Sequence, residues 1–453
     1  MLEAYQSDLL FATIPESTKI ADLNLVTSAI QYGGVSFEGN RLPFSLKPNV
    51  VSERDALHLA NHLGVVRSTL NRLLKRLRRD LSESRDSPLV KFFGTYSKWF
   101  GLMASEKRSI DDIMLMRFDA ARPRFGQFLA METNSGCPGG VINCANVKQA
   151  WYLSETARSY ESHFNIATYP VDRDTGFISF VLELASQLPS PNVAVCNFNG
   201  TYTNELSELS ERSSRLAKEK GCGRIVTADL REVKVRDGVT YAGDTPVGIL
   251  YNKIDATMVE PDDPEIGGWL DASASQSSVF LNSLAALYVG EAKSAFAALY
   301  DDAVRAHIAV SEQEVRALEE SIAYTKRVCD MTCEEYADVQ HNRHQYVLKA
   351  DYESRGVGVY VGATTNKPEW ERVLSDYISE NGVAQRAIDI ETREAEAQSY
   401  DCADLAVVEE FSGADAFFFG DTFAGLVGRA HQSSVFNVGN GGREVPTLIV
   451  KGQ

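Results

Sequence analysis

The chain has 453 residues, with 45 lysine and arginine residues against 62 aspartate and glutamate residues, so its net charge is −17. A chain of this length can bury a large core and form about three domains. Its negative charge repels nucleic-acid backbones and anionic lipid surfaces, so we expect a partner that is neither a nucleic acid nor a membrane.

The seven cysteines lie at scattered positions, without a Cys-x-x-Cys pair or a His-Cys spacing typical of a metal site. This usage is typical of a reducing compartment. The first eight residues lack the basic region of a signal peptide, and no apolar run approaches the roughly eighteen residues needed to cross a bilayer. We therefore expect a cytoplasmic protein.

The N-terminal region, residues 1–108, is predicted to be mostly helical, since residues 53–81 and 87–106 carry helical periodicity. Two short apolar runs follow, at 114–116 and 128–131. The segment between them contains Pro123 and Gly126, which favour a turn. The pattern predicts a β-hairpin.

Helical and apolar extended patterns then alternate up to about residue 251. Helices are expected at 146–162, 175–187 and 203–220, and strands at 192–197, 224–227 and, directly after Pro246, at 247–251. Such alternation is typical of a parallel sheet covered by helices.

The hairpin carries four polar side chains that suit a magnesium ion and an anion. Because side chains alternate along a strand, Arg117 and Asp119 share one face, as do Glu132 and Asn134. Carboxylate and amide oxygens are the ligands that magnesium prefers, and an arginine beside them presents a fork for an anionic oxygen. The alternative is that these side chains decorate a solvated hairpin.

Two lysines and a glycine loop form a second group. Lys293 lies in a helix-like stretch and Lys349 ends an apolar strand, ahead of a loop that contains Ser354, Gly356 and Gly358. Two ammonium groups and backbone N–H groups made accessible by glycine would suit a triphosphate. The alternatives are snorkelling lysines and an ordinary hairpin turn.

A later strand, near Gln385, Arg386 and Ala387, is at a distance at which its backbone could hold an adenine edge. A plain core strand explains it equally well.

Taken together, these residues resemble the ATP-grasp superfamily, and within it the circularly permuted branch of glutathionylspermidine synthetase-like enzymes and natural-product peptide ligases. The branch pattern is matched at Arg117, Asp119, Glu132, Asn134 and 138–140. These residues precede Lys293, Lys349 and Gln385, the reverse of the usual order. Near the end of the chain, residues 423–429 and 437–442 are similar to the closing motif, which gives Arg429 a role at the acyl phosphate.

The resemblance departs from the family pattern at two positions. Ala350 replaces a proline that often follows the second lysine, and Lys253 stands where relatives often have arginine. The second change leaves the acceptor contacts open.

The resemblance implies a mixed α/β, circularly permuted ATP-grasp fold with a helical lead-in. In that fold residues 109–285 would hold the hairpin and an α/β substrate domain, and residues 286–453 would form the nucleotide-binding lobes. It implies an ADP-forming ligase that joins a carboxylate to an amine through an acyl phosphate, with ATP and two Mg²⁺ ions. Asp119, Glu132 and Asn134 would hold the metal, while Lys293, Lys349, Ser354, Gly356, Gly358 and residues 385–387 would hold ATP. Arg117 and Arg429 would steady the transferred group.

Two alternatives use the same site: a small-molecule kinase and a nucleotide-binding protein without turnover. The substrates are left open, as is the oligomeric state, with a homodimer as one option.

Overall fold

The computed structural model describes residues 2–33, 36–37, 40–107, 109–200, 203–220, 223–254, 256–353, 356–398, 405–433, 435 and 441–452. Its α-helices are α1 (Leu2–Thr13), α2 (Glu16–Tyr32), α3 (Glu53–Ser82), α4 (Pro88–Phe92), α5 (Phe100–Ser105), α6 (Asn143–Trp151), α7 (Glu155–His163), α8 (Asp174–Ser186), α9 (Thr203–Lys220), α10 (Gly267–Ala274), α11 (Ser294–Tyr300), α12 (Asp302–His307), α13 (Glu312–Ser321), α14 (Cys333–His341) and α15 (Lys367–Ser379). The short helical turns include the 3₁₀ turn η1 (Gly94–Trp99) and the π-helical turn η6 (Ala286–Gly290). None of the described helices is long and apolar enough to cross a membrane.

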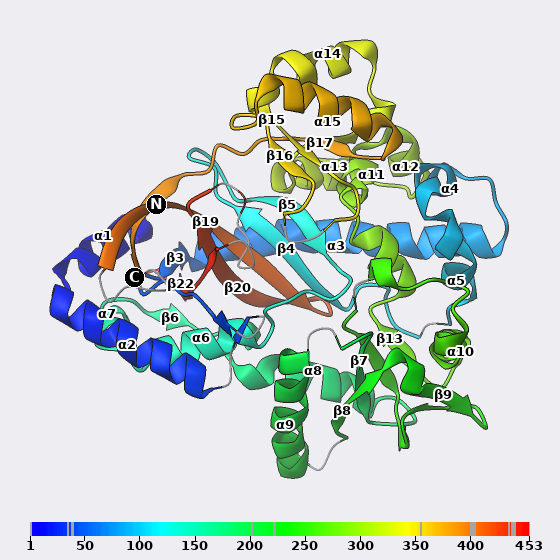
Figure 1. Ribbon diagram of the computed structural model, residues 1–453, viewed down its shortest axis with the longest axis horizontal. Helices are drawn as coiled ribbons and strands as arrows, with labels where there is room; N and C mark the ends of the chain where they lie inside the picture. The colour runs from blue at the N-terminus through cyan, green and yellow to red at the C-terminus, as the bar shows by residue number, and fades with distance from the viewer. Residues whose placement is uncertain are drawn as a thin grey trace.

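The central sheet joins strands from two distant parts of the chain (Figure 1). Its order is β21-β20-β19-β4-β5, with β18 also paired to β19, and its pairings are antiparallel. The strands are β4 (Leu115–Ala121), β5 (Leu129–Asn134), β18 (Thr392–Gln398), β19 (Leu405–Phe419), β20 (Thr422–His431) and β21 (Arg443–Val445). The predicted hairpin is thus present, and its strands extend far enough to include all four polar residues.

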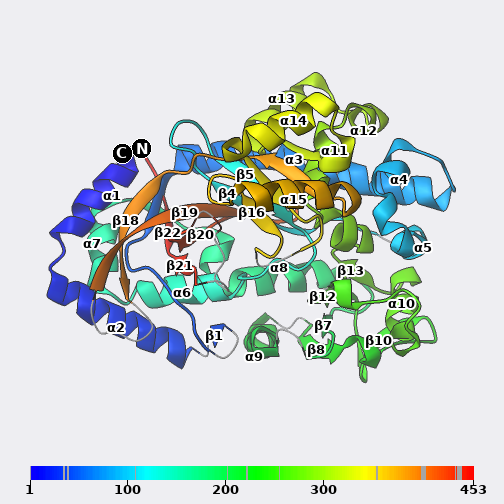
Figure 2. The ribbon, with the colours of Figure 1, turned by 45° about the horizontal axis from the view of Figure 1, so that its top comes forward.

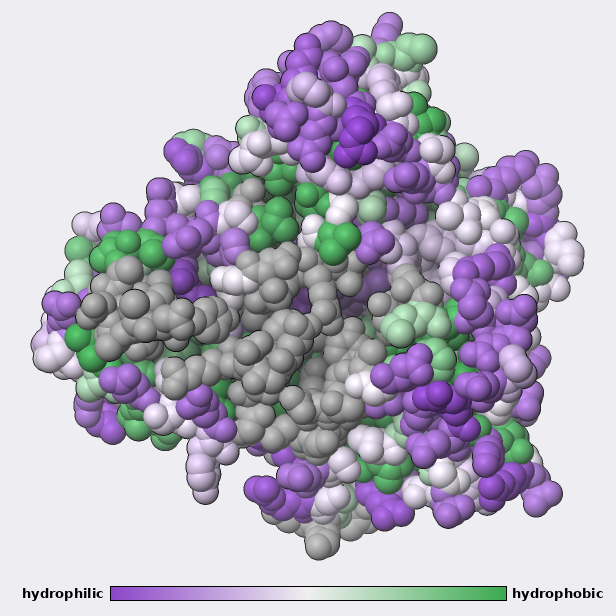
Figure 3. Space-filling model, in the orientation of Figure 1, coloured by the Kyte–Doolittle hydropathy of each residue, from purple (hydrophilic) through white to green (hydrophobic). Residues whose placement is uncertain are grey.

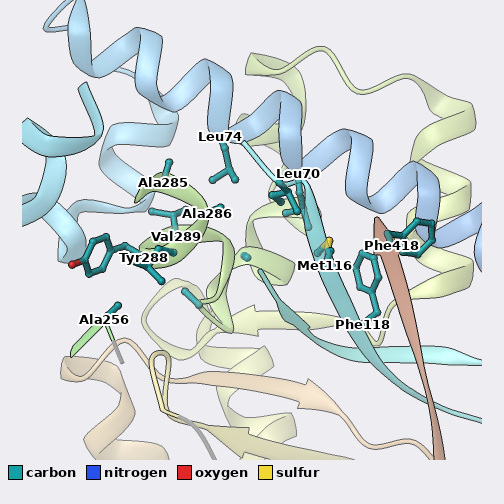
Figure 4. Packing of buried hydrophobic residues seen from close by; sticks show 14 of the residues in the cluster. Leu70, Leu74, Met116, Phe118, Ala256, Ala285, Ala286, Tyr288, Val289 and Phe418 are labelled. Atoms are coloured by element: carbon teal, nitrogen blue, oxygen red, sulfur yellow. The ribbon is translucent and has the colours of Figure 1, made fainter. Parts of the chain in front are cut away.

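The long helix α3 packs behind this sheet. Ser52, the residue before α3, caps the first turn of the helix, because its hydroxyl accepts a hydrogen bond from the Asp55 N–H at 3.0 Å. Buried residues recur every three or four positions along α3, which gives it one apolar face. Figure 4 shows Leu70 close to Met116 of β4, and Phe118 beside Phe418 of β19, with ring centroids 5.9 Å apart. The apolar face of the sheet is therefore turned toward α3.

The expected parallel sheet is present, with strand order β13-β12-β7-β8. Its strands are β7 (Val193–Asn197), β8 (Ile225–Asp229), β12 (Ile249–Asn252) and β13 (Val279–Leu281). The strand predicted directly after Pro246, at 247–251, is β12 and begins at Ile249. Pro246 ends the short strand β11 (Thr245–Pro246), which belongs to a small antiparallel sheet with β9 (Val233–Arg236) and β10 (Val239–Ala242).

Two predicted helices are broken. The stretch 146–162 forms α6 and α7, because Ser154 caps a new helix by accepting a hydrogen bond from the Ala157 N–H at 3.0 Å. The stretch 87–106 forms α4, η1 and α5, with the 3₁₀ turn beginning at Gly94. In both places periodicity continues across the break, so it did not reveal the change of direction.

A four-stranded antiparallel sheet, in the order β14-β17-β15-β16, builds a smaller lobe with its own apolar core. Its strands are β14 (Thr325–Arg327), β15 (Tyr346–Lys349), β16 (Val359–Val361) and β17 (Val383–Arg386). Trp370 of α15 is fully buried in that core. Figure 3 shows a mostly hydrophilic surface over α14 and α15, so the apolar faces of these helices are turned inward.

The helices α1, α2 and α7 gather at one end of the molecule, beside both termini (Figures 1 and 2). A three-stranded sheet lies there, formed by β3 (Asn49–Ser52), β22 (Thr447–Val450) and β6 (Ile166–Ala167). The remaining strands, β1 (Ser36–Phe37) and β2 (Asn40–Arg41), pair with each other.

Truncation of the α3 face should destabilise the fold. We expect Leu70→Ala, at a side chain with 0% exposure, to lower the free energy of unfolding by about 2–5 kcal/mol. Leu57→Ala is the matched control, because Leu57 lies on the same helix and is 44% exposed, and it should change stability by less than about 0.5 kcal/mol. Urea denaturation followed by circular dichroism measures both, and equal midpoints for the two variants would contradict this packing.

Candidate functional site

The hairpin brings the four predicted polar residues onto one face. In the β4–β5 register Asp119 pairs with Glu132 and Arg117 pairs with Asn134. The Arg117 guanidinium donates to both carboxylate oxygens of Asp119, at 2.7 and 3.2 Å, and to the Gly139 carbonyl at 2.9 Å. Asn134 Nδ2 donates to Asp119 Oδ1 at 2.8 Å. The residues after the hairpin, 138–140, therefore belong to the same cluster.

Arg429 reaches this cluster from β20. Its guanidinium donates to Asp119 and, at 2.5 Å, to Asp415 of β19. Burial would raise the pKa of Asp119, but the guanidinium groups of Arg117 and Arg429 outweigh it and hold this pKa below its usual range. Burial raises the pKa of Asp415 despite the Arg429 guanidinium. The result is a buried network of two arginines and two aspartates.

Lys293 lies against the metal-ligand candidates. It stands between η6 and α11, and its Nζ is 3.2 Å from Glu132 Oε2. Burial would lower the pKa of Lys293, but the carboxylates of Glu132 and Glu291 reverse the effect and raise it. Glu291 accepts hydrogen bonds from the N–H groups of Ser135 and Gly136, each at 2.6 Å, so it fixes the chain directly after β5.

Lys349 and Gln385 reach the same place from the smaller lobe. The β4–β5 register shifts between Asp119 and Ala120, so that Met131 falls between paired residues. The Met131 carbonyl accepts from Lys349 Nζ at 3.1 Å and from Gln385 Nε2 at 2.9 Å. A bulge commonly re-aims a group in this way. The two lysines and the carboxylates, distant in sequence, thus lie together in one buried polar cluster.

Arg386 and Ala387 lie at the rim of this region. Their backbone N–H groups donate to the carbonyls of Tyr324 at 2.8 Å and Gln345 at 2.9 Å. Both residues line a cavity of about 420 Å³, together with Leu129 and Ile388. Because these two N–H groups already have partners, an adenine edge held here would need the carbonyl oxygens of this strand.

The glycine loop is partly described. Gly356 and Gly358 adopt positive φ angles of 77° and 66°, and a Cβ at Gly358 would lie 2.7 Å from the Ala350 side chain. The Gly358 carbonyl accepts from the Ala350 N–H at 2.9 Å, so the loop returns to the strand that carries Lys349. Glycine is therefore required at position 358. Ser354 lies outside the described residues.

The oxygen donors suit magnesium with one constraint. Among the described residues no group of three or more His, Cys, Asp or Glu side chains is placed to hold a metal ion. Both oxygens of Asp119 accept two hydrogen bonds each, which uses the capacity of a carboxylate. An ion here would need Glu132, the amide oxygen of Asn134, waters and a nucleotide's phosphates, with Asp119 exchanging one arginine contact.

The sequence analysis did not identify three further acidic residues in or beside the polar cluster: Asp415, Glu291 and Asp351. Asp415 had a signal, since it is the one carboxylate in the apolar run from Ala414 to Phe419. Glu291 and Asp351 lie two residues from Lys293 and Lys349, but no spacing rule marks them. Glu444, which accepts from the Cys144 thiol at 3.1 Å, is a fourth buried acid on the neighbouring strand β21.

Neither a family model nor a curated protein sequence matches this chain. Among solved structures, a glutathione synthetase-like effector from Globodera pallida in its apo form matches with a TM-score of 0.58 and 11% identity, over 96% of this chain and 97% of that one. This similarity shows the fold, and it confirms the predicted mixed α/β, ATP-grasp fold.

Two further structures show a slighter similarity. A putative gamma-glutamylcysteine synthetase from Methylobacillus flagellatus KT has a TM-score of 0.39 and 11% identity, over 83% of this chain and 87% of that one. A D-alanyl-alanine synthetase A from Vibrio cholerae O1 biovar eltor has a TM-score of 0.27 and 9% identity, over 57% of this chain and 88% of that one.

The environment of Lys349 predicts an unusual titration. Burial lowers the pKa of Lys349 from 10.5 to about 8, although Glu132 opposes the shift. The unfolded chain keeps this proton up to the ordinary pKa of 10.5, whereas the folded chain releases it near pH 8. The free energy of unfolding therefore rises with pH between these two values, and this contribution is lost as the pH falls through 8. In nucleotide-free protein, the ¹³Cε resonance of Lys349, assigned with a Lys349→Arg variant, should titrate near pH 8. A midpoint near 10.5 would contradict this environment.

Proposed function

We propose that this chain is an ADP-forming ligase of the circularly permuted ATP-grasp type, which joins a carboxylate to an amine. The observation that carries the proposal is the meeting of Lys293 with Glu132 and of Lys349 with the adjoining Met131 carbonyl. These cationic and oxygen-donor groups lie far apart in the chain, and their convergence suits a magnesium-bound triphosphate. The full-length similarity in fold to a glutathione synthetase-like protein supports the same conclusion. The order of these groups, with the oxygen donors first, supports the permuted arrangement.

In this proposal the protein acts by position and charge. Lys293 and Lys349 hold the α- and β-phosphates, and the loop that contains Gly356 and Gly358 covers them and excludes water. Gln385 and the adjoining strand border the adenine. Glu132, Asn134 and Asp119 would hold magnesium, expected as two ions, which would supply positive charge against the phosphates.

The arginines serve the transferred group. Arg117 and Arg429 each have a guanidinium within the buried network, and each can exchange a contact with Asp119 for a phosphoryl oxygen. Asp415 and the Gly139 carbonyl retain the arginines in place during that exchange. The substrate carboxylate attacks the γ-phosphorus, the β–γ bridging bond breaks with release of ADP, and the amine then displaces phosphate from the acyl phosphate.

A screen for ADP release tests the proposal. Amino acids and other small carboxylates are paired with amines in the presence of ATP and magnesium, and products are identified by mass. A ligase requires both substrates and yields their condensation product. A product carrying a phosphoryl group on a hydroxyl would instead identify a kinase, and nucleotide binding without ADP release under any pairing would identify a protein without turnover.

Glu132→Ala should abolish ADP formation while the fold stays intact. Loss of a group that stabilises the transition state commonly costs about 3–4 kcal/mol, so we expect a fall in rate of several hundredfold. Glu334→Ala, at an exposed position in the first turn of α14, is the control and should keep the wild-type rate. Circular dichroism checks folding. Near-normal turnover by a folded Glu132→Ala protein would show that this polar cluster is not the active site.

A further inference from the structure

Asp351, two residues after Lys349, joins three separate parts of the chain. Its side chain is buried and accepts hydrogen bonds from the Ser294 N–H at 2.7 Å, the Ser294 hydroxyl at 3.0 Å and the Tyr96 hydroxyl at 2.7 Å. Its backbone carbonyl accepts from the Lys293 N–H at 2.8 Å. Asp351 therefore bonds both to the backbone N–H of Lys293 and to that of the next residue, Ser294.

The start of α11 explains why this carboxylate is needed. The helix begins at Ser294, and the residue before it, Lys293, provides no side-chain cap. The first N–H groups of a helix have no partner within the helix, and buried N–H groups need one. Asp351 provides that partner from the turn after β15, so the position of Lys293 depends on where Asp351 lies.

The same residue fixes the second lysine. Asp351 follows β15, whose last residue is Lys349, and the intervening Ala350 is held by its hydrogen bond to Gly358. Two peptide units thus separate the Asp351 carboxylate from the backbone of Lys349. The backbones of both lysines are therefore positioned by one residue, Asp351, although the lysines lie more than fifty residues apart in sequence.

Tyr96 extends this arrangement to the N-terminal region. It lies on η1, is 4% exposed, and its ring meets that of Tyr352 edge to face at a centroid distance of 6.0 Å. The hydroxyl of Tyr352 donates to the Leu287 carbonyl at 2.5 Å. The same N-terminal segment contacts the smaller lobe, where the Arg327 guanidinium stacks 3.7 Å from the Phe92 ring centroid. Residues 92–96 therefore contact the smaller lobe and the residues directly before the glycine loop.

We propose that Asp351 is a positioning residue that sets the spacing of Lys293 and Lys349 for a nucleotide, and that Tyr96 holds Asp351 in place. This proposal rests on the proposed function. Small displacements of groups that hold a substrate weaken binding and catalysis strongly, and such groups need a rigid supporting shell. The helical lead-in thereby contributes to the nucleotide site.

Isothermal titration calorimetry with magnesium and a non-hydrolysable ATP analogue tests this role in the full chain. We expect Asp351→Ala to weaken binding about tenfold, since a buried cap and its hydrogen bonds are lost. Asp351→Asn should recover most of the affinity, because its amide oxygen can still accept from the Ser294 N–H. Tyr96→Phe, which removes one hydroxyl, should weaken binding about threefold.

Asp22→Ala is the matched control. Asp22 is also buried, and it accepts from the N–H and hydroxyl of Thr156, at 2.8 and 2.7 Å, at the start of α7. It holds α2 to α7, at the end of the molecule beside the termini (Figure 1). Its loss should lower the melting temperature as Asp351→Ala does, and leave nucleotide affinity unchanged.

Hydrogen exchange in nucleotide-free protein gives a second readout. The amides of residues 293–298 should exchange faster in Asp351→Ala than in wild type, and at the wild-type rate in Asp22→Ala. Wild-type affinity in a folded Asp351→Ala protein would overturn the positioning role. If that variant does not fold, unchanged affinity in Tyr96→Phe would overturn it. A wild-type protein that binds no nucleotide would overturn the proposed function itself, and this inference with it.

Discussion

The pairing of Arg117 and Arg429 with Asp119 is the contact on which the geometry of the polar cluster depends. Charged groups removed from water need partners with good geometry, and here two guanidinium groups and two carboxylates provide them for one another. A slip of one residue in β4 would carry Arg117 and Asp119 to the face that holds Phe118 and packs on α3. The network therefore specifies the strand register, and the register in turn places Glu132 and Asn134.

One sheet serves two purposes as a result. Phe118 and Phe418 pack in the core on one face, while the neighbouring residues Arg117 and Asp119 form the polar cluster on the other. The bulge at Met131 adds a third feature, since it turns a backbone carbonyl toward the lobe that carries Lys349 and Gln385. The first two features follow from alternation along two short strands, and this is why a few residues of sequence could indicate them, whereas the bulge interrupts that alternation.

Sequence patterns predicted what local alternation or family motifs determine. The strands at Val193–Asn197 and Tyr346–Lys349, the helix at Thr203–Lys220 and the grouping of the hairpin residues belong to this class. The missed residues depend on contacts between distant segments. Asp351 gains its meaning from Ser294 and Tyr96, 57 and 255 positions away, and no local pattern contains that information. The broken helices were missed for a related reason, since tertiary packing decides where an amphipathic stretch changes direction.

The two sheets beside the polar cluster have separate cores, and this bears on how a nucleotide could be held. The central sheet packs on α3, and the smaller sheet packs on α14 and α15 around Trp370. Between them, the Ala323 N–H donates to the Ala130 carbonyl and joins the lobes at one edge. The contacts of Lys349 and Gln385 with Met131, and of Lys293 with Glu132, are polar and can be exchanged for ligand oxygens. Each such hydrogen bond contributes about 1 kcal/mol net, far less than the apolar burial within either core. Exchange of these polar contacts for ligand oxygens would therefore cost a few hydrogen bonds, while both cores and the contacts that Asp351 and Arg327 make between the lobes stay intact.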